Sequence, residues 1–122
     1  MTKKVLDVGQ CNADHNQITQ LLSREFDVEI QRAHSFDEAT QMALDTPFDL
    51  ILINRILDAG GTAGMSILNA IKTQPSTAET PVMIVSNYAD AQADAVSAGG
   101  MAGFGKLELD LEKTRDLLSQ VL

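Results

Sequence analysis

The chain has 122 residues, 44% hydrophobic and 21% charged, which predicts one domain that buries a substantial core and has no long disordered segment. Its formal net charge of −8 and scattered basic residues argue against nucleic-acid binding, because phosphate contacts need clustered lysine and arginine. The single cysteine, Cys11, excludes an internal disulfide, and no apolar run approaches a membrane span. We therefore expect a cytoplasmic protein of one domain, residues 1–122, without membrane contact.

The first part of the chain alternates between strand and helix patterns. Residues 3–8 predict a short strand, and apolar residues at helical spacing after Ala13 predict a helix capped by Asn12 or Asp14. Residues 28–33 alternate apolar and polar side chains, as a half-exposed strand does. Strands separated by single helices are typical of an α/β fold.

The middle of the chain contains the strand around which we expect the fold to be organised. Ser35 and Glu38 form a capping box that starts a second helix, and Pro47 ends that helix. Residues 49–54 are mostly apolar, which predicts a strand buried on both faces of a parallel sheet. A glycine-rich turn over residues 58–64 leads into a third amphipathic helix.

The last part of the chain predicts two more strand–helix units. Residues 82–85 form a fully apolar strand, and residues 90–98 a weakly held helix whose one sizeable apolar anchor is Val96. Residues 99–106 predict a very short glycine-rich strand, and residues 107–122 an amphipathic segment. Its residues available to cover the sheet are Leu111, Leu117, Leu118, Val121 and Leu122.

Five such units predict an α/β fold: a doubly wound, five-stranded parallel sheet of flavodoxin-like order 2-1-3-4-5 with five helices. Ligands of these folds bind at the carboxyl ends of the strands, at the point where the strand order reverses. Asn54 ends the predicted central strand, so the functional site is expected around it.

Four segments, in order and spacing, resemble the CheY-like receiver domain of two-component response regulators over essentially the whole chain. They are Lys3–Val8, Phe48–Arg55 with the glycine turn, Thr80–Ser86, and Ala98–Gly100 with Lys106. The resemblance implies a phosphoacceptor aspartate at the end of the third strand and two acidic residues that bind Mg²⁺ after the first. It also implies a hydroxyl residue and a lysine that hold the phosphoryl oxygens.

Only half of this chemistry is present in the chain. Ser86 matches the hydroxyl position and Lys106 the lysine, but Asn54 stands at the phosphoacceptor position and Gly9-Gln10 at the acidic pair. An amide is neither a nucleophile nor an anion, so the resemblance implies a degenerate receiver with no bound metal or other cofactor. Two further departures are Leu107 in place of the usual proline, and Gly103 in place of an aromatic that arrives one residue late as Phe104.

Each matched residue also has a structural interpretation. Asn54 either holds the vestigial phosphoacceptor pocket in one conformation by hydrogen bonding, or is only a polar residue that ends the strand. Lys106 either points to solvent or donates to the carbonyl group of Asn54. Ser86 is expected to cap the following helix rather than to bind a ligand.

Asp7 and Asp58 are the candidate ligands if the cation site has been rebuilt. Asp7 occupies a normally apolar position, and a buried carboxylate needs a partner, for which Lys3, Lys4 and Lys106 are the candidates. Residues 9, 10 and 54 all lack the carboxylate that the resemblance implies there. If only this charge is missing, substituting aspartate at the three positions should restore Mg²⁺ binding.

Cys11 and His15 are four residues apart and suggest nucleophilic catalysis, but the sequence offers no third group to orient the histidine. The preferred hypothesis is signalling through phosphorylation-independent protein–protein contact, and the protein is not expected to be an enzyme. The expected partner is a histidine kinase, an output domain, a downstream signalling protein or a second copy, through a surface in residues 90–122. Alternatives are a receiver still switched by phosphoryl or another small ligand, and a small enzyme using Cys11 or the glycine turn.

Overall fold

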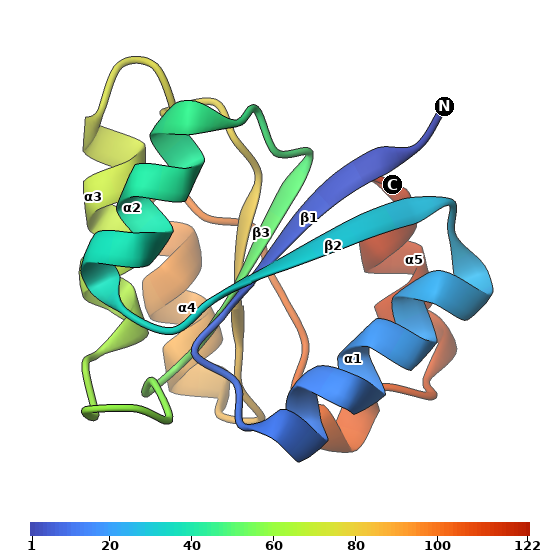
Figure 1. The fold of residues 1–122 in the computed structure, drawn as a ribbon. Helices are drawn as coiled ribbons and strands as arrows, with labels where there is room; N and C mark the ends of the chain where they lie inside the picture. The colour runs from blue at the N-terminus through green and yellow to red at the C-terminus, as the bar shows by residue number, and fades with distance from the viewer.

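The computed structural model describes all 122 residues and shows a parallel sheet between two layers of helices (Figure 1). The strands are β1 (Lys3–Val8), β2 (Val28–Ala33), β3 (Leu50–Asn54) and β4 (Val82–Val85). The helices are α1 (Asn12–Glu25), α2 (Phe36–Asp45), α3 (Gly64–Thr73), α4 (Ala89–Ser97), the short 3₁₀ helix η1 (Lys106–Glu108) and α5 (Glu112–Ser119). The strands pair in the order β2-β1-β3-β4.

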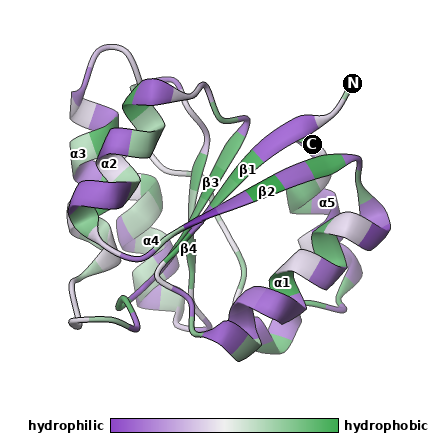
Figure 2. Ribbon diagram, in the orientation of Figure 1, coloured by the Kyte–Doolittle hydropathy of each residue, from purple (hydrophilic) through white to green (hydrophobic).

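Each face of the sheet has its own hydrophobic core. Helices α2, α3 and α4 cover one face, and α1 and α5 cover the other (Figure 1). The helices direct hydrophobic residues inward and hydrophilic residues outward, whereas β3 and β4 are hydrophobic nearly throughout (Figure 2). This matches the prediction of a doubly wound α/β fold. None of the helices combines the length and the hydrophobicity that a membrane span requires.

Strand β3 lies between β1 and β4, as its composition predicted. Its residues from Leu50 to Ile53 are all 0% exposed, because one alternate pair packs in each core. Asn54 ends the strand and is partly exposed, at the edge where the strands reach their carboxyl ends.

The predicted fifth strand is not formed, so the five-stranded sheet was wrong by one strand. Residues 99–106 make a single parallel bridge to β4, at Met101, whose amide N–H donates to the carbonyl of Val82 (2.8 Å). The next rung of a parallel ladder would join the Gly103 N–H to the Ile84 carbonyl. The amide side chain of Gln92 bonds to both groups instead: its Oε1 accepts from Gly103 N (2.7 Å), and its Nε2 donates to Ile84 O (2.8 Å).

The C-terminal segment also differs from the prediction. It is divided into η1 and the eight-residue helix α5, and the Thr114 hydroxyl donates back to the Glu108 carbonyl (2.7 Å) across the break. Leu118 is fully buried, but Leu111 is 45% exposed and does not cover the sheet.

Helix boundaries gave mixed results. Ser35 caps α2 as predicted, since its hydroxyl accepts from Glu38 N (3.1 Å). Helix α1 begins after Cys11 without a side-chain cap, so neither Asn12 nor Asp14 has the predicted role. In α4 the buried anchor is Ala95, because Val96 is 50% exposed.

Candidate functional site

A pocket of about 470 Å³ opens at the carboxyl ends of β3 and β4. It brings together Asn54, Ser86 and Lys106, which lie far apart in the sequence and end three successive segments of the fold. Its other lining residues are Arg55, Ile56, Val85, Asn87, Tyr88 and Leu107. Gly9 and Gln10, the other two members of the predicted site, do not line it.

Asn54 is positioned by contacts with Gly9 on one side and with Gly64 on the other. Its side-chain Nδ2 donates to the Gly9 carbonyl (3.1 Å), which ties the end of β3 to the end of β1. A carboxylate has no proton to donate, so an ionised aspartate would face this carbonyl with two acceptor oxygens. On the other side, a Cβ at Gly64 would overlap the backbone carbonyl of Asn54, so only glycine lets α3 begin here.

Gly9 leaves no room for the acid that receiver chemistry needs. Its φ angle is +77°, which L side chains rarely adopt, and a Cβ would overlap the side chain of Leu57. Gln10 is only 2% exposed, and both polar atoms of its side chain are buried without a hydrogen-bond partner. Shape as well as charge therefore separates this corner from a magnesium site.

Lys106 follows neither predicted alternative. Its Nζ lies 2.7 Å from Oδ2 of Asp14, in the first turn of α1. The hydrogen bond from Lys106 lowers the pKa of Asp14, which keeps that carboxylate ionised. The ammonium group thus remains at the pocket, paired with α1 rather than with Asn54.

Ser86 has a structural role at the start of α4. Its hydroxyl accepts from the Tyr88 N–H (3.1 Å), two residues along, and Tyr88 is the N-cap of that helix. The backbone N–H of Ser86 in turn donates to the Phe104 carbonyl (3.0 Å). Ser86 therefore connects the end of β4 to both α4 and the fifth segment.

Asp7 has a partner that the sequence did not suggest. The side chain is 0% exposed, and its Oδ2 lies 2.6 Å from Nδ1 of His15, so the predicted pairing with a lysine was wrong. Burial raises the pKa of Asp7, while the hydrogen bond and charge of His15 oppose that rise. Asp7 shares the α1-facing side of β1 with Val5, which brings it under the first turns of α1.

Neither candidate cation ligand lies in a suitable cluster. Asp58 is exposed and uses its backbone N–H to donate to the Gly9 carbonyl (2.9 Å). No group of three histidine, cysteine, aspartate or glutamate side chains is placed to hold a metal ion.

The Cys11–His15 pair acquires a third residue. Asp7 orients His15, so the expectation that no orienting group exists was wrong. However, no hydrogen bond joins the Cys11 thiol to the His15 side chain; only the backbone of the two residues is bonded, from His15 N to Cys11 O (2.9 Å). The arrangement lacks the contact by which a histidine activates a nucleophile.

Sequence reasoning missed three residues that shape this end of the molecule: Asp14, Gly64 and Gln92. Asp14 was interpreted as a helix cap and Gly64 as part of a turn. Gln92 had one visible signal, because it is the only long polar side chain in an alanine-rich helix.

No protein-family model and no curated protein sequence matches the chain. Solved structures match it over nearly its whole length. The signal receiver domain of a DNA-binding response regulator from Colwellia psychrerythraea has 23% identity and a TM-score of 0.80, covering 97% of this chain and 96% of its own. The chemotaxis response regulator CheY4 of Vibrio cholerae has 20% identity and a TM-score of 0.76, with both chains covered completely.

A third similar structure is the receiver domain of the sensor histidine kinase PA1611 from Pseudomonas aeruginosa, with a magnesium ion coordinated in its active-site cleft. It has 17% identity and a TM-score of 0.74, and the match covers 99% of this chain and 98% of that one. The chain therefore has the fold of a CheY-like response-regulator receiver domain.

Proposed function

We propose that this chain is a receiver module of two-component signalling that acts by binding another protein and not by accepting a phosphoryl group on aspartate. The observation that carries the proposal is the hydrogen bond from Asn54 Nδ2 to the Gly9 carbonyl. This bond depends on an N–H donor, which the asparagine side chain has and an ionised aspartate lacks. It therefore stabilises the pocket in a form that needs no phosphorylation.

The residues at the old metal position do not fit Mg²⁺. This hard cation prefers carboxylate oxygens, but Gly9 has no side chain and the Asn54 side chain is a neutral amide that donates to the Gly9 carbonyl. The carboxylate of Asp14, which reaches the pocket residue Lys106, is paired with its ammonium group. No step through a metal or a phosphoaspartate is therefore assigned to this protein.

A second candidate function keeps the pocket in use. Lys106 and Ser86 still line a cavity of about 470 Å³, and together they are the kind of groups that hold an anion. A small anionic ligand would then replace the phosphoryl group as the switch, with Lys106 exchanging Asp14 for the ligand.

Intact-mass measurement after incubation with acetyl phosphate and Mg²⁺, combined with amide NMR in Mg²⁺ and beryllofluoride, tests the proposal. We expect no phosphoryl adduct and no saturable shifts at Asn54, Ser86 or Lys106. The receiver domain of PA1611, whose structure holds magnesium, is the positive control. A stoichiometric adduct would refute the proposal.

The same titration separates the second candidate. Saturable shifts with phosphate or beryllofluoride in the absence of Mg²⁺, abolished by Lys106→Gln but not by Lys113→Gln, would favour an anion switch. Lys113 is a suitable control because it pairs with Glu108 on the surface, outside the pocket.

A further inference from the structure

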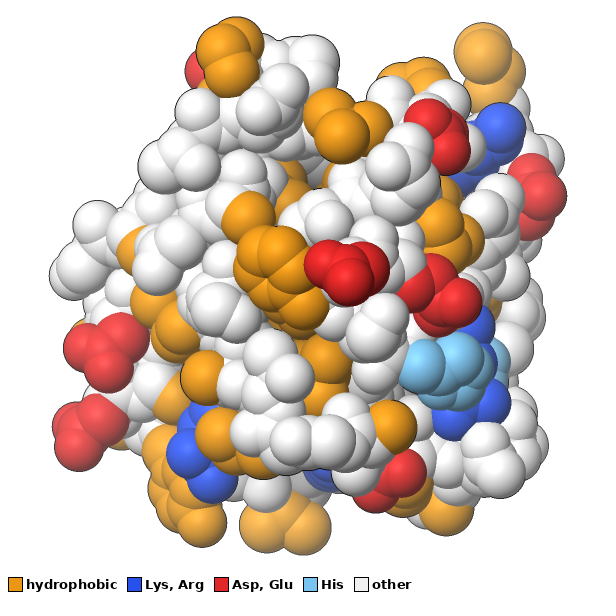
Figure 3. Space-filling view, turned by 60° about the vertical axis from the view of Figure 1, so that its left-hand side comes forward, with side chains coloured by type: hydrophobic (Ala, Val, Ile, Leu, Met, Phe, Trp, Pro, Cys, Tyr) orange, Lys and Arg blue, Asp and Glu red, His pale blue; other side chains and the backbone are white.

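A second groove, of about 550 Å³, lies between the start of α3 and the first turns of α4, next to the pocket around Asn54. We call it the α3–α4 groove. The residues used below are Ile56, Met65, Tyr88, Asp90, Ala91 and Asp94. Figure 3 looks onto the α2–α3 side of the molecule, where hydrophobic side chains lie beside acidic and basic ones.

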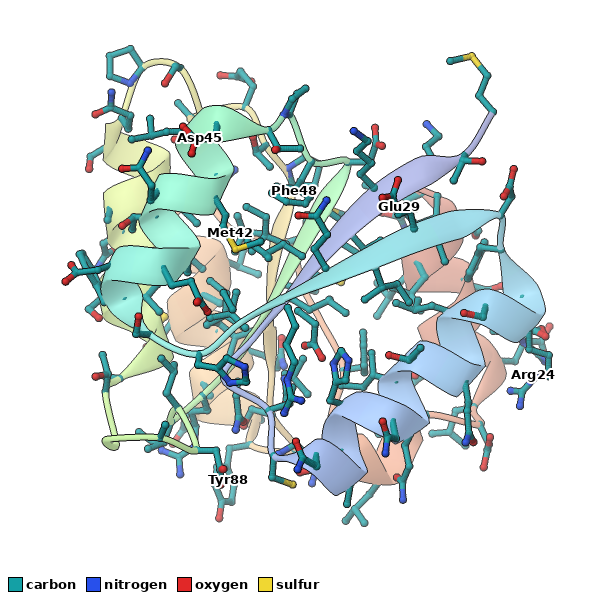
Figure 4. The ribbon with its side chains drawn as sticks, viewed as in Figure 1. Arg24, Glu29, Met42, Asp45, Phe48 and Tyr88 are labelled. Carbon is teal, nitrogen blue, oxygen red and sulfur yellow. The ribbon has the colours of Figure 1, made fainter.

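The groove exposes apolar side chains that belong to neither core. Tyr88 is 61% exposed and Ile56 is 40% exposed, high values for large hydrophobic residues in a domain of this size. Figure 4 shows Tyr88 projecting away from the sheet at the carboxyl ends of the strands. The Arg55 guanidinium lies 4.9 Å from the centroid of the Tyr88 ring, so one face of this ring is covered by a cation of the chain itself.

The acidic side chains beside this apolar surface are unpaired. Asp90 and Asp94 are four residues apart on α4, both are exposed, and neither takes part in an ion pair. Helix α4 contains no basic residue to balance them. Like charges at this spacing repel each other along a helix, and a cation between them relieves the repulsion.

From this combination we infer that the α3–α4 groove binds a basic segment of a protein partner, in which a lysine or arginine lies next to a large apolar side chain. The cation meets Asp90 and Asp94, and the apolar side chain packs against Ile56, Met65 and Ala91. Charge complementarity selects this occupant, because the groove lining contains two aspartates against one cation, Arg55, and the chain has a net charge of −8. The inference rests on the proposed function, whose partner it describes.

The test uses the full ¹⁵N-labelled chain and an eight-residue probe peptide of lysine, leucine and alanine. Its counterpart contains glutamate in place of lysine. We expect the lysine peptide to shift the amide resonances of the groove saturably at low salt, with weaker binding as NaCl is raised. The glutamate peptide should leave them unchanged.

Paired variants locate the binding. Asp90→Asn with Asp94→Asn should weaken binding of the lysine peptide about tenfold, because two close charge contacts are lost. Glu112→Gln with Asp116→Asn is the matched control: the residues are also exposed, four apart on one helix and outside every ion pair, and the net charge changes equally. Ile56→Thr should weaken binding, whereas Val96→Thr, at an exposed valine outside the groove lining, should not.

Equal affinity of the two acidic double variants, or shifts that map to another face, would overturn the inference. Groove shifts that appear on raising the protein concentration alone would also overturn it, by assigning the groove to a second copy. Repeating the titration with Mg²⁺ and beryllofluoride separates the two proposals. Peptide binding only in their presence would refute phosphorylation independence but retain the groove, and no binding in either condition would refute the groove alone.

Discussion

At the scale of single residues, the end of β1 has neither the charge nor the space that a site for Mg²⁺ needs. Asn54 and Asp58 both donate to the carbonyl of Gly9, so the backbone at this corner is fixed by two hydrogen bonds. Leu57 fills the space that a side chain at position 9 would need. Introducing aspartate at positions 9, 10 and 54 would therefore disrupt packing before it could supply a cation site.

Gly9→Ala tests this packing. Gly9 and Gly60 both have positive φ angles, but a Cβ at Gly60 would meet nothing within 4 Å. Gly60→Ala therefore reports backbone strain alone, about 1 kcal/mol, and Gly9→Ala should lower the free energy of unfolding by a further 1–3 kcal/mol, roughly, through overpacking. Urea denaturation of both variants provides the measurement. Equal losses would show that Leu57 moves aside freely.

Asp7→Asn tests the buried carboxylate. Because the pKa of Asp7 is raised, the folded state binds more protons than the unfolded state between the ordinary and the raised pKa. Stability contributed by this group is thus greatest below its ordinary pKa and falls as pH rises through the raised value. The stability of Asp7→Asn relative to the wild type should therefore increase from pH 4 to pH 7, as followed by urea denaturation.

His15→Ala is the companion variant. It leaves Asp7 buried without its 2.6 Å partner and should cost about 3 kcal/mol at pH 7. Gln10 and Arg32 are the other polar side chains near this pair; the Arg32 guanidinium donates to the Gln10 carbonyl (2.9 Å).

For the first variant, Asp7→Asn, a stability relative to the wild type that does not change with pH would contradict the raised pKa of Asp7.

At the scale of elements, the features that the sequence predicted correctly are those that depend on periodic burial and local hydrogen bonds. The four strands, the Ser35 cap and the central position of β3 follow from apolar patterns and local hydrogen bonds. The missing fifth strand depends on a long-range contact, because Gln92 lies eleven residues from Gly103 and acts through its side chain. The Asp7–His15 and Lys106–Asp14 pairs likewise join separate elements, which no local pattern reports.

Gln92→Ala tests the role of the inserted amide. It leaves Ile84 O and Gly103 N unpaired, which should lower the free energy of unfolding by about 1–3 kcal/mol and speed exchange of the Gly103 amide proton. Gln17→Ala, at an exposed position of α1 without side-chain hydrogen bonds, is the control. Slower exchange at Gly103 would mean instead that the strand closes directly onto β4.

At the scale of the whole molecule, the helices that cover one face of the sheet pack against its core unequally. Helix α3 buries Gly64, Ile67, Leu68 and Ile71, whereas α4, of similar length, buries only Ala95. Because helices in proteins are stabilised mainly by packing, α4 should open at a lower free energy than α3. Native-state hydrogen exchange measures both in one experiment, and equal protection of the two helices would contradict the expectation.

The Gln92 insertion also determines how this sheet meets other chains. Along the outer side of β4, Val82 O, Ile84 O and Ser86 N are occupied by Met101, Gln92 and Phe104. A strand of another protein therefore finds no continuous row of free backbone hydrogen-bonding groups on β4, although the fifth strand is not formed. The other border is β2, which pairs only with β1 and carries two charged residues, Glu29 and Arg32, and charges on an edge strand discourage strand addition. The Gln92 side chain, together with the backbone of Met101 and Phe104, thus covers the border at which the sheet is incomplete.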